Sequence, residues 1–130
     1  MTSSPRRRAR GDRGQATVEL ALLLPFVVLL LLAIVQVGLV AHDQVLLTHA
    51  TREAARAAAV EADPAAAERA AAAGGGLDPG RLHVEVTGRA GEGSTVRVVL
   101  TYDERTEVAG IGRLVPDLEL RADATMRVEG

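Results

Sequence analysis

Glu19 is the side chain whose position asks most clearly for a chemical explanation. It stands directly before residues 20–41, a run of 22 residues with no ionisable side chain. A helix of that length reaches roughly 33 Å, enough to cross a hydrocarbon core of about 30 Å. A carboxylate beside such a span costs free energy, about 2.5–3.5 kcal/mol at mid-bilayer and less near the edge. The cost of this carboxylate makes Glu19 a candidate for a functional role.

Gln36 is a polar side chain deep in the same run, which Pro25 and Gly38 also interrupt. Its amide could bond to a partner helix for roughly 0.6–2 kcal/mol, or it could be a lone amide near the outer interface. The sequence leaves both readings open. Membrane helices tolerate a proline such as Pro25 as a kink.

The other residues capable of chemistry do not form a recognisable site. His49 and Glu53 are spaced i,i+4, with His42 two turns earlier, but no HExxH or similar zinc spacing is present. The glycine-rich stretch 74–80 lacks the Lys and Ser/Thr of a phosphate-binding loop. The chain has no cysteine, which excludes disulfides and cysteine metal sites. We expect solvated surface histidines, no metal, no cofactor and no enzymatic activity.

Charge is distributed unevenly along the chain. The first 14 residues contain five Arg and one Asp, a net charge of +4, whereas residues 42–130 carry a net −5. Arginines before an apolar span predict a cytoplasmic N-terminus and an extracytoplasmic remainder. Phe26 and Tyr102 are the only aromatic residues, so a base-stacking surface is absent and nucleic acid is not an expected partner.

Residues 42–60 continue the helical pattern with many alanines and no Gly or Pro. One face of this helix should be buried, and it is formed by Leu46, Leu47, Ala50, Ala54, Ala57 and Ala58. The opposite face is formed by Thr48, His49, Arg52 and Arg56. Asp63 and Pro64 predict the cap and first turn of a new helix, which Gly74–Gly76 should end.

The last third of the chain changes to a period of two. Alternation of apolar and polar side chains predicts strands at 82–87, 95–102 and 118–128, with a hairpin loop at 88–93. Residues 103–116 form a longer connection, with Ile111, Leu114 and Val115 as an apolar anchor. Three strands with one apolar face need a cover, and the alanine-rich helix can supply it. The expected class is α+β: a single-pass transmembrane helix extended into a stalk, with a small three-stranded antiparallel sheet packed on its outer half.

The N-terminal segment resembles type IV pilin-like proteins, and GQATVELALLLP followed by THATREAARAAAV resembles the TadE-like family of tight-adherence pilus assembly. In the resemblance, a basic leader ends at Gly14, Gln15 becomes the first mature residue and Glu19 the fifth. The resemblance covers residues 13–60 well and the C-terminal third only in outline. Gln15 departs from the aromatic first residue common in type IV pilins.

The resemblance implies a non-enzymatic minor component or assembly factor of a tight-adherence type IV pilus. Its implied partners are the membrane, a prepilin peptidase, other pilin-like, TadE-like or TadF-like subunits, the assembly platform with its ATPase, and the pilus. Glu19 would pair with the amine of a neighbouring subunit's first residue, and Gln36 is a second helix-pairing candidate.

The expected organisation is a cytoplasmic leader (1–14), a transmembrane helix (15–41), an extracytoplasmic helical stalk (42–73), a glycine-rich linker (74–81) and the sheet (82–130). Two alternatives stay open. The span could be an uncleaved tether for an extracytoplasmic interaction domain unrelated to pili, or it could be removed as a signal sequence to release a small secreted domain.

Overall fold

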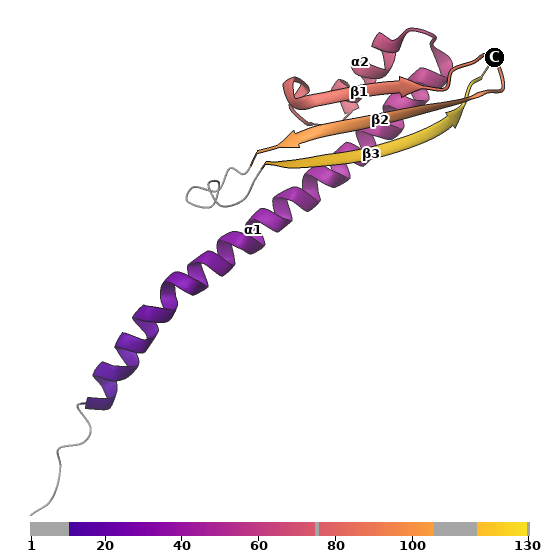
Figure 1. Ribbon diagram of the computed structural model, residues 1–130. Helices are drawn as coiled ribbons and strands as arrows, with labels where there is room; N and C mark the ends of the chain where they lie inside the picture. Colours follow the sequence, from indigo (N-terminus) through magenta and orange to yellow (C-terminus); the bar gives the residue numbers. More distant parts are fainter. Residues whose placement is uncertain (1–10, 75, 106–116, 130) are drawn as a thin grey trace, which may run out of the picture. The chain divides into compact units, whose positions relative to one another are not determined.

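The computed structural model describes residues 11–74, 76–105 and 117–129, with side chains from Gly14 onward. Its elements are α1 (Gly11–Val60), α2 (Pro64–Gly74), the short 3-10 helix η1 (Pro79–Arg81), β1 (Leu82–Thr87), β2 (Thr95–Glu104) and β3 (Leu118–Arg127) (Figure 1). The chain divides into two units, Met1–Gln36 and Val37–Gly130, and α1 contributes to both. The α+β class with a long apolar N-terminal helix and a three-stranded antiparallel sheet is confirmed.

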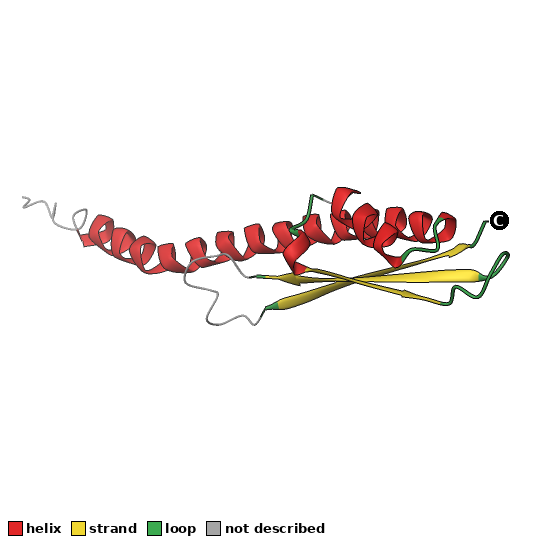
Figure 2. Cartoon of the chain, turned by 90° about the horizontal axis from the view of Figure 1, so that it is seen from above, coloured by secondary structure: helices red, strands yellow, loops and turns green. Residues whose placement is uncertain are grey.

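Within the C-terminal unit, the sheet has the order β1-β2-β3 with antiparallel neighbours. Leu82, Tyr102 and Leu120 are paired across the three strands and form one row on the inner face. The helices of this unit lie on one side of the sheet (Figure 2). The two layers bury the alternate apolar residues of β2, which the period of two predicted.

Alanine allows the helices to approach closely around this core. Leu47 and Leu100 are the largest fully buried side chains, and alanines from α1 and α2 fill the space around them. Thr51 is also buried, and its hydroxyl donates to the carbonyl oxygen of Leu47 at 2.6 Å. That bond satisfies the one polar group on the buried face of the helix.

The break between α1 and α2 follows the predicted cap. The side chain of Asp63 accepts a hydrogen bond from the backbone N–H of Ala65 at 3.0 Å, and Pro64 is the first residue of α2. The carboxylate thereby satisfies an N–H group that has no partner inside the helix. The turn that links β1 to β2 depends on glycine, because Gly88 has φ +86° and a Cβ there would lie 2.9 Å from the carbonyl oxygen of Thr95.

The buried face of α1 is broader than its sequence predicted. Leu47, Ala50, Ala54 and Ala58 are buried as expected, whereas Leu46 and Ala57 are only half-buried. Ala55 and Ala59 are buried in addition. At Ala59 the end of β3 contributes to this wider face, because Ala59 shares a cavity wall with Met126 and Val128 and its carbonyl oxygen accepts from the N–H of Glu129. The apolar anchor predicted at Ile111, Leu114 and Val115 lies outside the described residues, as do residues 1–10 of the leader.

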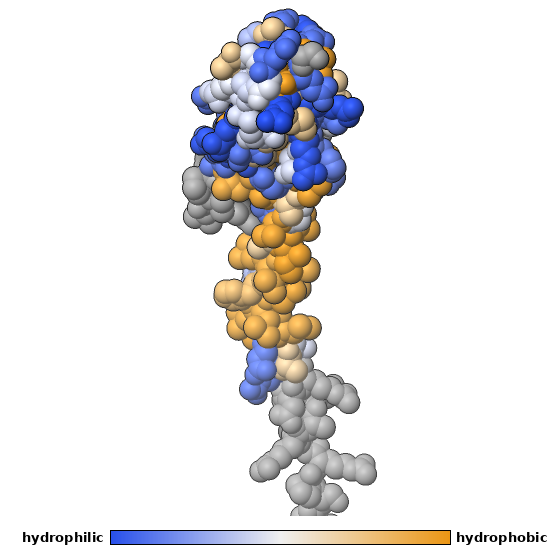
Figure 3. Space-filling model, turned by 90° about the vertical axis from the view of Figure 1, so that its right-hand side faces the viewer, coloured by the Kyte–Doolittle hydropathy of each residue, from blue (hydrophilic) through white to orange (hydrophobic). Residues whose placement is uncertain are grey.

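In the N-terminal unit, the apolar side chains of α1 are exposed. Phe26 is 69% exposed and Leu30 is 61% exposed, and the most apolar window of the helix has no buried residue. Figure 3 shows apolar side chains over most of the visible surface of this part of α1, with hydrophilic atoms at its lower end. Gly14–Val60 is long and apolar enough to cross a membrane by length and composition. The N-terminal helix therefore fits a single-pass membrane anchor.

Truncating Leu120 to Ala should destabilise the C-terminal unit by about 2–5 kcal/mol, because a buried side chain leaves a cavity. Val98→Ala removes fewer atoms from the same face and should cost less. Either loss is a large part of the stability of a small domain. Leu118→Ala is the matched control, since Leu118 is 47% exposed in the same strand and should change stability by about 0.5 kcal/mol. Thermal unfolding of the full chain in detergent measures all three, and equal effects of Leu120→Ala and Leu118→Ala would contradict the face assignment.

Candidate functional site

The residues singled out near the N-terminus lie together on the first turns of α1. The side-chain amide of Gln15 donates to Oε1 of Glu19 at 3.2 Å, an i,i+4 contact between exposed residues. Gly14 is exposed, and a Cβ there would meet nothing within 4 Å. The bond between Gly14 and Gln15 lies inside the helix. Glycine weakens a helix by about 1 kcal/mol relative to alanine, so Gly14 lowers the stability of the helix beside this bond.

The residues that interrupt the apolar run do not end the helix. α1 continues through Pro25, although proline removes one backbone hydrogen bond. Gln36 is half-buried, and its Oε1 has no hydrogen-bond partner among the described residues. An amide oxygen without a partner in an apolar surrounding is costly, which keeps Gln36 a candidate for helix pairing.

The histidines are on the surface, as expected. His42 and His49 are exposed, and His83 Nε2 lies 3.6 Å from Oδ2 of Asp103 in an exposed cross-strand pair. Within the described ranges, no group of three or more His, Cys, Asp or Glu side chains is placed to hold a metal ion.

Arg89 makes a contact that the sequence did not reveal. It belongs to the β1–β2 hairpin loop, and its Nη1 donates to the carbonyl oxygens of Ala58 and Glu61 at the end of α1. These carbonyls lack partners inside the helix, and the helix dipole places negative potential there. The hairpin is thus tied to the end of the stalk helix by a charge-assisted cap.

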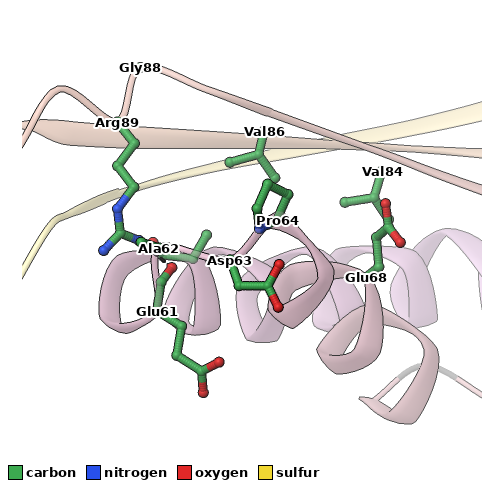
Figure 4. A pocket seen from close by; sticks show the side chains of 10 residues that line it. Glu61, Ala62, Asp63, Pro64, Glu68, Val84, Val86, Gly88 and Arg89 are labelled. Atoms are coloured by element: carbon green, nitrogen blue, oxygen red, sulfur yellow. Dashed lines mark hydrogen bonds between the residues drawn. The ribbon is translucent and has the colours of Figure 1, made fainter.

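A trough between α2 and β1 is the second feature that the sequence did not reveal. It consists of two open cavities of about 340 and 520 Å³ that share Glu68 and Val84, and we call it the α2–β1 trough. In Figure 4, Val84 and Val86 of β1 face Pro64 and Glu68 of α2 across the first cavity. No motif marks the trough, since its walls come from residues about 20 positions apart in the sequence.

Residues 14–56 match the family model described as TadE-like protein. The match includes Gly14, Gln15, Glu19 and Gln36, and it extends into the part of α1 that covers the sheet. A search of curated proteins found no match, and neither did a search of solved structures. The resemblance predicted from the sequence is therefore confirmed over residues 14–56, which match the TadE-like family.

Proposed function

We propose that this protein is a non-enzymatic, membrane-anchored component of a tight-adherence type IV pilus system, either a pilin-like minor subunit or an assembly factor. The observation that carries the proposal is the TadE-like match over residues 14–56. This match coincides with the exposed apolar helix and includes the carboxylate at its membrane edge. The C-terminal unit would then present the sheet outside the membrane as an interaction module.

The leader and its charge support a specific topology. Five Arg among the first 14 residues favour a cytoplasmic N-terminus and an extracytoplasmic C-terminal unit. A prepilin peptidase would cut between Gly14 and Gln15, leaving Gln15 with a free amine. The glycine would assist this step, because it lowers the free energy needed to open the first turns of the helix.

Glu19 would then serve in assembly. Its side chain is four residues from the new N-terminus and is exposed on the helix, where a neighbouring helix can approach it. The amine of a neighbouring subunit would replace the amide of Gln15 as its partner. In low dielectric an ion pair is much stronger than at a surface, although desolvation offsets much of the gain. Gln36 would add a hydrogen bond between helices further along the span.

The partners follow from this role. The prepilin peptidase, TadE-like or TadF-like subunits, the assembly platform with its ATPase, and the pilus are the proposed contacts of the chain. The peptidase and the platform would meet the membrane helix and the leader. Other subunits would meet both the helix and the C-terminal unit.

The intact mass of the protein purified from membranes tests the proposal. Loss of residues 1–14 is the expected result, because it requires cleavage at the predicted bond. A full-length mass would show an uncleaved tether, and loss of everything through Ala41 would show a removed signal sequence. Either of these masses would overturn the pilin-like route.

A further inference from the structure

We propose that the α2–β1 trough binds an extended segment of a partner protein, which adds to β1 as a fourth strand and places a basic side chain beside Glu68. The proposal concerns the C-terminal unit and does not depend on whether the anchor is cleaved. Addition of a strand to an open sheet edge is a common mode of peptide recognition, in which main-chain bonds supply affinity and side-chain pockets supply specificity.

The main-chain groups of β1 are available for such pairing. At the end of β3, Val128 N–H donates to Ser94 O at 2.8 Å, and Val128 O accepts from Gly93 N–H at 3.2 Å. The even-numbered residues of β3 therefore direct their backbone N–H and C=O groups toward β2. In β2, the even-numbered residues therefore direct their N–H and C=O groups to β3 and the odd-numbered residues direct theirs to β1. By the β1–β2 register, the odd-numbered residues of β1 pair with β2, and the N–H and C=O groups of the even-numbered residues point away from the sheet.

Val84 and Val86 consequently direct their N–H and C=O groups away from the sheet. No described residue donates to these groups or accepts from them. Leu82 differs, because its N–H already donates to the carbonyl oxygen of Pro79. The available part of the edge is thus short and suits a segment of about five residues.

The opposite edge of the sheet is a poorer candidate. Near one end of β3, Arg121 O accepts from the side-chain amide of Gln44 at 3.2 Å. Just beyond its other end, Glu129 N–H donates to Ala59 O at 3.2 Å. The helix α1 therefore occupies backbone groups on that edge at both ends.

The chemistry of the trough defines its occupant. Val84, Val86, Ala62 and Pro64 supply apolar walls, so alternate side chains of the added strand should be apolar. Three carboxylates line the trough, those of Glu61, Asp63 and Glu68.

The cations at the trough leave one of these carboxylates available. Arg69 lies 3.7 Å from Glu61 and 3.6 Å from Asp63, and Arg89 is bonded to main-chain carbonyls. No described cation pairs with Glu68, which both cavities share. A central Arg or Lys flanked by apolar residues is therefore the complementary pattern.

The probe is a fluorescein-labelled peptide, Thr-Val-Thr-Arg-Thr-Val-Thr, titrated against the full chain in detergent with anisotropy as the readout. Val84→Pro removes an outward N–H without breaking the β1–β2 ladder and should weaken binding about tenfold or more. Glu68→Gln should weaken it about two- to fivefold, as for an exposed ion pair. Thr125→Pro is the matched control, because it places a proline at an outward position of β3 and should leave binding unchanged.

Two changes to the peptide complete the test. Methylation of its central amides should abolish binding if main-chain bonds carry the affinity, and Arg replaced by Glu should weaken it. The proposal is overturned if the peptide does not bind at about 1 mM, or if Val84→Pro binds as well as the wild type. Equal loss from Thr125→Pro would also overturn the proposal, because the loss would not be specific to the edge at β1. Dissociation of a dimer by Val84→Pro would instead assign the edge to a second copy of the chain.

Discussion

Glu19→Ala is expected to abolish association with neighbouring pilin-like helices while leaving membrane insertion intact. Insertion should be equal or slightly better, because the substitution removes a charge from the membrane edge. Assembly should fail because the amine of the neighbouring subunit's first residue loses its counter-charge. Leaving one member of a buried ion pair without its partner costs about 3–5 kcal/mol, which corresponds to at least about a hundredfold loss in association.

Two conservative variants separate charge from packing at this position. Glu19→Gln keeps the shape and can still accept a hydrogen bond from Gln15, but it should fail to assemble because it is neutral. Glu19→Asp keeps the charge on a shorter side chain and should retain part of the association. Co-purification of differently tagged copies and pilus counts measure the effect. If Glu19→Ala assembles as well as the wild type, the pilin-like mechanism is wrong, and the alternative of an uncleaved membrane tether unrelated to pili replaces it.

The fold was predictable because two periodicities in the chain are strong and do not overlap. The alternation in β2 places Val96, Val98 and Leu100 on one face, and no helix can bury that pattern on one side. The alanine-rich stretch of α1 has no such alternation and no helix breaker. Glu19 could likewise be identified from the sequence as a candidate site residue, because a charge beside a long apolar run is rare.

The features of the C-terminal unit that depend on tertiary contacts were not predictable. Arg89 lies in a loop sequence, GRAGEG, that is typical of a hairpin, and nothing local shows that its side chain reaches the end of α1. The extra burial of Ala55 and Ala59 depends on tertiary packing in the common core, to which the end of β3 contributes beside Ala59. The α2–β1 trough depends on two elements, since α2 supplies one wall and β1 the other. Sequence spacing predicts which residues share a face of one element but not which element covers that face.

Gly14→Leu is expected to leave the leader attached. By the resemblance to prepilins, the peptidase accepts only a very small residue at this position. The structure gives a second reason, because leucine is a better helix former than glycine and would make the first turns of α1 harder to open. The mutated position is exposed and a Cβ there meets nothing within 4 Å, so the substitution should not disturb the fold. Insertion should also persist, because residues 20–41 are unchanged.

Gly14→Ala is the matched control, since alanine stabilises the helix about as well as leucine but remains small. If the size of the side chain limits cleavage, Gly14→Ala should mature at least in part while Gly14→Leu does not. If helix stability limits cleavage, both should be blocked to a similar degree. Blots of membrane fractions and intact mass distinguish the mature and full-length forms. Because an uncut chain cannot present the amine of Gln15, Gly14→Leu should also lose assembly, and adding Glu19→Ala to it should cause no further loss. Normal maturation of Gly14→Leu would show that this bond is not the cleavage site.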